Sequence, residues 1–149
     1  MRRSERGSAL AEAAMALPIL FLLVFGLFDL GQWEFQGSQA SAAARDGARA
    51  GLMAYKTAEG TTASPGGAGF TTINSAVAAR LAGQTYSVAV ACVSSLDEVA
   101  KPCSSSQPDV DRIKVTVTWT RSPLTPVTAS FGTQQVSGHA VMKVIGAPE

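Results

Sequence analysis

The sequence predicts an α+β protein in which a long N-terminal helix is followed by a short helix and a small antiparallel β-sheet. Three patterns support this class. Residues 13–28 form an uncharged apolar run, an alanine-rich stretch without proline continues to about residue 58, and the C-terminal half alternates apolar and polar residues with period two. With 149 residues, the chain has room for one small domain and an anchor, because ordinary domains have about 100–150 residues.

The charge of the chain argues against nucleic-acid binding. The formal net charge is +1, and the cations that follow the N-terminus are scattered along the sequence. Nucleic-acid-binding domains concentrate lysine and arginine on one surface. We therefore expect no nucleic-acid partner.

The apolar run is predicted to cross a membrane once. As a helix it would be roughly 24 Å long, somewhat less than the roughly 30 Å hydrocarbon core. Glu12 and Asp29 bracket it, three arginines precede it, and Glu34 follows it. The positive-inside rule then places the N-terminus in the cytoplasm and the chain beyond residue 30 outside. Trp33 would be either an interfacial aromatic residue or a packing residue of the outer domain.

A cleavable secretory signal has a similar layout, but two features argue against it here. Its small-residue cleavage region should follow the apolar run directly. In this chain the small residues at 38–44 come too late, and residues 29–36 between them and the run are bulky.

The helix is expected to continue beyond the membrane, from Glu34 to about Ala58, because this stretch is rich in good helix formers. Asp46 and Arg49 would form an i,i+3 ion pair. Small residues recur at four-residue spacing and would let another helix approach closely. Either a helix of another subunit or the chain's own domain could pack there. The small residues are Ala40, Ala44 and Ala48, together with Ala43, Gly47 and Gly51.

A second, shorter helix is predicted within residues 70–83. The glycine- and proline-rich residues 59–69 cannot sustain a helix and separate it from the first. Apolar residues then recur at intervals of three and four, and Gly83 is placed to end the helix. We expect this apolar stripe to be core: Phe70, Ile73, Val77 and Leu81.

Three half-buried antiparallel strands are predicted after the second helix. Pro123 and Pro126 exclude a central strand between the second and third and favour a long loop. The inward faces are expected to be Tyr86, Val88, Val90 and Cys92 in the first strand, Ile113, Val115, Val117 and Trp119 in the second, and Val136, Ala140, Met142 and Val144 in the third, within residues 134–145.

Two cysteines, Cys92 and Cys103, lack the spacing and the histidine partners of a zinc site. A disulfide is the simpler interpretation if the domain lies outside the cytoplasm, and it would contribute about 2–3 kcal/mol. Two free buried thiols are the alternative. Acidic pairs nearby could bind calcium, but they lack the spacing of a known calcium loop, so solvated charges are favoured. These acids are Asp97, Glu98, Asp109 and Asp111.

No catalytic constellation is recognisable. His139 lies in a strand pattern without an Asp, a Glu or a nucleophilic Cys at a suitable spacing, so a surface or sheet-packed histidine is expected. The chain also lacks a phosphate-binding glycine loop and a G-x-S-x-G motif. We expect neither enzymatic activity nor a cofactor or metal.

The N-terminus resembles the processing site of type IV prepilins. The leader MRRSERG is followed by SALAE, with a small residue after the glycine and an acid as the fifth residue beyond it. The resemblance implies that a membrane prepilin peptidase cleaves between Gly7 and Ser8. Glu12 would then be the fifth residue of the mature chain.

A longer segment is similar to the TadE-like proteins of tight-adherence (Tad, or Flp-type) pilus systems. The matching features are Glu12, the Leu-Pro step at Pro18, the Gly-x-x-Asp-x-Gly step around Asp29, and AARDGAR at 43–49. The tail, VTVTWTRSPLTPVTASFG and SGHAVMKVIG, also looks like the family. Ala13 departs from it, because the tight-adherence pilins commonly carry tyrosine or another bulky residue after the acid.

The resemblance implies a minor pilin or pseudopilin with a pilin-like fold. Its partners would be the prepilin peptidase, other pilin and pseudopilin subunits, the inner-membrane assembly platform and the membrane itself. Glu12 would form an assembly charge pair with the new ammonium group of Ser8, in its own chain or in an adjacent subunit. Pro18 removes one helical hydrogen bond, so either bending or a static kink is expected there.

The expected organisation has three parts: a basic leader at 1–7, a transmembrane and extended N-terminal helix at 8–58, and an extracytoplasmic α+β domain at 59–149. The protein would lie in the cytoplasmic (inner) membrane and could enter an extracellular pilus. The alternative is an unprocessed single-pass membrane protein that displays a small interaction domain.

Overall fold

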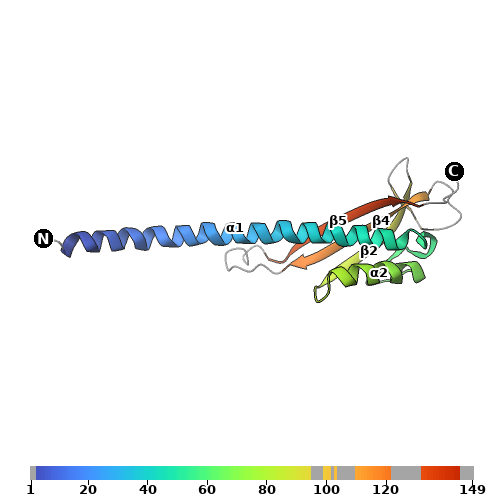
Figure 1. Ribbon diagram of the computed structural model, residues 1–149, viewed down its shortest axis with the longest axis horizontal. Helices are drawn as coiled ribbons and strands as arrows, with labels where there is room; N and C mark the ends of the chain where they lie inside the picture. The colour runs from blue at the N-terminus through green and yellow to red at the C-terminus, as the bar shows by residue number, and fades with distance from the viewer. Residues whose placement is uncertain (1–2, 95–98, 102, 104–109, 122–131, 145–149) are drawn as a thin grey trace.

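A single long helix carries a folded domain at its C-terminal end (Figure 1). The computed structural model describes residues 3–94, 99–101, 103, 110–121 and 132–144. Helix α1 (Arg3–Gly51) has 49 residues, and its N-terminal half projects away from the remaining elements. The α+β class, with a long apolar helix, a short helix and a small antiparallel sheet, is confirmed.

The sheet has the order β1-β2-β4-β5, with β3 paired to the end of β2, and all the pairings are antiparallel. The three predicted strands correspond to β2, β4 and β5. The other two strands have two residues each, too few for an alternating pattern to reveal them. The strands are β1 (Gly60–Thr61), β2 (Tyr86–Ser94), β3 (Ala100–Lys101), β4 (Val110–Arg121) and β5 (Gln134–Lys143).

The core lies between the sheet and two helices, the C-terminal part of α1 and α2 (Ala68–Arg80). Both helices lie on the same side of the sheet (Figure 1). The predicted stripe of α2 is buried, as are the predicted inward faces of the strands except for the half-buried Tyr86 and Met142. Period two in the strands and period 3.6 in α2 therefore identified the core.

The first helix ends earlier than predicted, at Gly51 instead of near Ala58. Beyond it the backbone turns tightly, with Leu52 N–H donating to the Arg49 carbonyl and Ala54 N–H to the Gly51 carbonyl. A 3-10 turn, η1 (Tyr55–Thr57), follows. The alanine-rich composition favours helix, but the turn lets α2 pack back against α1, and this tertiary packing overrides local propensity.

Helix α1 crosses β5 so closely that only glycine fits at position 138. A Cβ added to Gly138 would lie 2.3 Å from the backbone nitrogen of Ser41. The strand therefore contacts the helix backbone directly. This contact fixes where the long helix lies on the edge strand of the sheet.

Candidate functional site

The predicted cleavage site lies near the free end of α1. The helix runs continuously through the Gly7–Ser8 bond, and a Cβ placed on Gly7 would meet no atom within 4 Å. Glu12 lies one turn further along, with an exposed side chain. Both residues are therefore accessible on the projecting half of the helix. Whether the bond is cut remains a prediction.

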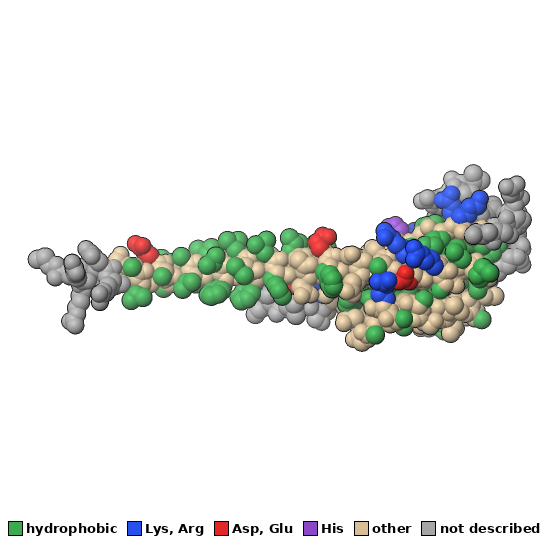
Figure 2. Space-filling view, viewed as in Figure 1, with side chains coloured by type: hydrophobic (Ala, Val, Ile, Leu, Met, Phe, Trp, Pro, Cys, Tyr) green, Lys and Arg blue, Asp and Glu red, His purple; other side chains and the backbone are tan. Residues whose placement is uncertain are grey.

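Residues 7–28 of α1, called the arm below, are exposed at every position, and Figure 2 shows apolar side chains along the visible face of this projecting half. Its large hydrophobic residues between Leu10 and Leu30 are 48–74% exposed. Within the described residues, this is the one helix long and apolar enough to cross a membrane, by length and composition. Side chains this apolar are unfavourable in water and need lipid or neighbouring protein around them.

Pro18 lies within this arm, and the helix is unbroken through it. The arm also looks straight in Figure 1. Proline removes one backbone hydrogen bond, but neither a sharp kink nor an interruption of the helix accompanies it here.

The apolar arm ends at a buried ion pair that the sequence analysis did not find. Asp29, at the middle of α1, accepts a hydrogen bond from the guanidinium of Arg121, at the end of β4, over 3.0 Å. Both side chains are more than nine-tenths buried, whereas Phe28 and Leu30 on either side of Asp29 are exposed. The pair therefore joins the sheet to the helix at the boundary of the arm.

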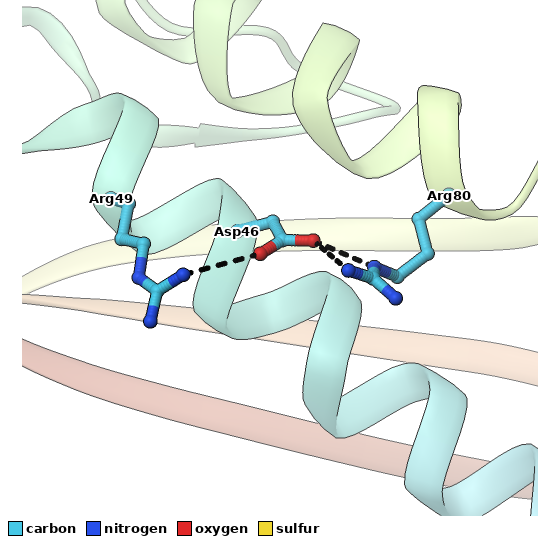
Figure 3. Close-up of polar contacts among 3 residues, drawn as sticks. All are labelled: Asp46, Arg49 and Arg80. Carbon is cyan, nitrogen blue, oxygen red and sulfur yellow. Dashed lines mark hydrogen bonds and ion pairs between the residues drawn. The ribbon is translucent and has the colours of Figure 1, made fainter.

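A second charged contact joins the two helices on the surface (Figure 3). Asp46 of α1 is held by Arg80 of α2, whose Nε and guanidinium nitrogen both lie 2.6 Å from one carboxylate oxygen. The predicted Asp46–Arg49 pair is also present, at a looser 3.9 Å. Arg80, the closer of the two partners of Asp46, is thus thirty-four residues away from it in the sequence.

The small residues of α1 pack within the chain. Ala40, Ala44 and Ala48 are fully buried. A Cβ on Gly47 would lie 2.9 Å from Val77 of α2, and one on Gly51 would lie 2.7 Å from Ile73. Of the two interpretations considered for this strip, the structure has the contact with the chain's own helix and sheet.

Cys92 and Cys103 are joined by a disulfide. The Glu59 carboxylate accepts a hydrogen bond of 2.9 Å from the Cys103 backbone N–H, so the bonded loop is also tied to the segment that follows α1. Of the four acids considered as calcium ligands, Asp97, Glu98 and Asp109 lie outside the described residues, and only the backbone of Asp111 is described. The described residues contain no group of three His, Cys, Asp or Glu able to hold a metal.

His139 is exposed on β5, directly opposite Thr116 of β4. It lies on the face of the sheet that the helices do not cover, and no acid or cysteine is adjacent to it in the register of the sheet. The described part of the chain therefore offers no catalytic arrangement around its single histidine.

The comparisons agree with the interpretation of the N-terminal segment. Residues 7–49 match the family model TadE-like protein, so the resemblance inferred from the sequence is confirmed over that segment. The family supports a structural, non-enzymatic role associated with the Tad pilus. No curated protein and no solved structure matches the chain significantly. The matched segment includes the arm, Asp29 and the buried small residues.

Proposed function

We propose that this chain, which carries the N-terminal helix of TadE-like proteins, is a minor pilin or pseudopilin that takes part in assembly of a tight-adherence pilus. A prepilin peptidase removes residues 1–7. The mature helix then anchors the protein in the cytoplasmic membrane, with the α+β domain outside, until it joins other pilin and pseudopilin subunits at the assembly platform.

The observation that carries this proposal is the apolar arm with a single acid near its start. An arm exposed on every side suits a subunit that exchanges lipid for protein neighbours, since both surround it with apolar groups. A membrane anchor alone does not need Glu12. A charged side chain in hydrocarbon costs roughly 2.5–3.5 kcal/mol even on translocon scales.

Cleavage after Gly7 gives that acid a partner. It creates an ammonium group at Ser8, about one helical turn from Glu12 along the helix. Pairing within the chain or with a neighbouring subunit neutralises the carboxylate, and an unpaired charge in a dry filament interior is strongly disfavoured. The charge pair thereby favours burial of cleaved subunits, whose Glu12 carboxylate is neutralised, in the filament interior.

The nearly isosteric Glu12→Gln variant tests this role in the native host. Membrane insertion should be retained, because removing a charge makes an apolar segment easier to insert. Cleavage should also continue, since Glu12 lies beyond the cut bond, whereas piliation and recruitment of the subunit should fall. Normal piliation with normal recruitment would exclude the assembly role of Glu12. Asp46→Asn, which removes an acid with solvent-accessible ion pairs from the same helix, is a control for loss of an acid as such.

A further inference from the structure

The face of α1 turned away from the domain carries two opposite charges. Glu34 and Arg45 are exposed, and neither has an ion pair or side-chain hydrogen bond within the described residues. They are eleven residues apart, which in an α-helix corresponds to about 16.5 Å along the axis and about 20° around it. They therefore share one face but cannot reach each other within one chain.

The same side of α1 has an apolar hollow at the level of the buried Asp29, on the opposite face of the helix. The hollow is lined by Leu27, Phe28, Gly31, Gln32 and Phe35. A Cβ on Gly31 would meet no atom within 4 Å, and the three large apolar side chains around it are 57–70% exposed. The hollow thus has room for an apolar side chain from another molecule.

The hollow and the charges require the same displacement of a neighbouring helix. Leu20 is 55% exposed and precedes Gly31 by eleven residues, the interval that separates Glu34 from Arg45. Leu20, Gly31, Glu34 and Arg45 all fall within about 60° of one another around the helix. One parallel shift therefore brings Leu20 of one copy to Gly31 of the next and Glu34 to Arg45.

We infer that this face of α1 binds a second copy of the same chain, parallel to the first and displaced outward by eleven residues. The inference rests on the proposed function, because two copies at equal depth in a bilayer do not have this displacement. It arises when one subunit has moved out of the membrane by about 16.5 Å relative to the other. Glu12 does not oppose the shift, since it can pair with Ser8 of its own chain.

Cysteine cross-linking in the native host tests this arrangement. Two differently tagged copies, one carrying Glu34→Cys and the other Arg45→Cys, are expressed together, oxidised mildly and analysed without reduction. We expect a cross-linked dimer that contains both tagged copies. Each variant alone should give little dimer, because equal positions lie about 16.5 Å apart. Glu34→Cys with Ser38→Cys is the matched control, since Ser38 is exposed nearby but at the wrong interval.

A second pair of cysteines reports whether the charges set the displacement. Leu20→Cys in one copy should cross-link to Gly31→Cys in the other. Adding Glu34→Arg to the Leu20→Cys copy should remove this dimer, and adding Arg45→Glu to the Gly31→Cys copy should restore it. If the first charge reversal removed the dimer only by causing misfolding, the second reversal would not restore the dimer.

The inference is overturned if neither mixed pair cross-links, or if Glu34→Cys alone dimerises as well as the mixture. Its failure is distinct from failure of the proposed function, which is measured by the mature mass and by piliation of the Glu12→Gln strain. Normal processing with no displaced cross-link would leave the pilin assignment in place and exclude this contact.

Discussion

Replacing Asp29 by asparagine is expected to destabilise the attachment of the outer domain to α1. The substitution preserves the size of the side chain but removes the charge that Arg121 contacts at 3.0 Å. Arg121 would remain buried near the end of β4 without the Asp29 carboxylate that neutralises its charge. Leaving one charge of a buried pair uncompensated costs far more than losing an exposed pair.

The size of the effect follows from burial. Both side chains are more than nine-tenths buried, and breaking such a pair from one side costs about 3–5 kcal/mol. Asparagine keeps an oxygen that can accept a hydrogen bond, so we expect the lower end, about 3 kcal/mol. For a domain of this size that corresponds to a fall in melting temperature of roughly 10 °C.

The assay is thermal unfolding of the purified chain in detergent micelles, followed by circular dichroism. Glu34→Gln is the matched control, because it removes an exposed acid from the same helix and should change stability by less than about 0.5 kcal/mol. Asp29→Asn combined with Arg121→Gln should cost less than the sum of the single changes. Equal melting temperatures for Asp29→Asn and Glu34→Gln would refute the reasoning.

Four further outcomes are expected. Gly138→Val should lower the free energy of unfolding in denaturant by about 1–3 kcal/mol or more, because the valine side chain would meet the backbone of Ser41. Stability equal to that of Ser137→Ala would contradict the close contact. Asp46→Ala should cost less than about 1 kcal/mol in the same assay, because its ion pairs are solvent-accessible, and a loss above 2 kcal/mol would argue against this view. Alkylation without reduction should label neither Cys92 nor Cys103 in protein from the native compartment, whereas labelling of both would mean that they are free there. Gly7→Leu should leave the precursor uncut in the host, since the peptidase must approach the backbone closely, and an unchanged mature mass would count against the site.

The fold could be predicted where local periodicity carries the information. Alternation identified the inward residues of β2, β4 and β5, such as Val88 and Val115, and helical spacing identified Ile73 and Val77 in α2. These patterns reflect which side of each element faces the core. The strands β1 and β3 escaped prediction because two residues do not make a pattern, and the end of α1 escaped because packing of α2, not composition, sets it.

The charged contacts could not be predicted from sequence spacing. Arg121 is ninety-two residues beyond Asp29, and Arg80 is thirty-four beyond Asp46. The only sequence signal for the first pair was an acid, Asp29, at the end of an apolar run, and it did not indicate which cation would neutralise it. The small residues of α1 allowed two packing partners, and the three-dimensional arrangement was needed to choose between them.

The pilin assignment depends most directly on processing of the leader. The decisive measurement is the intact mass of the protein purified without reduction from the membranes of its own host. We predict a chain that begins at Ser8, with residues 1–7 absent and Glu12 as the fifth residue. A full-length chain that begins at Met1 would contradict the pilin assignment and favour an unprocessed single-pass membrane protein.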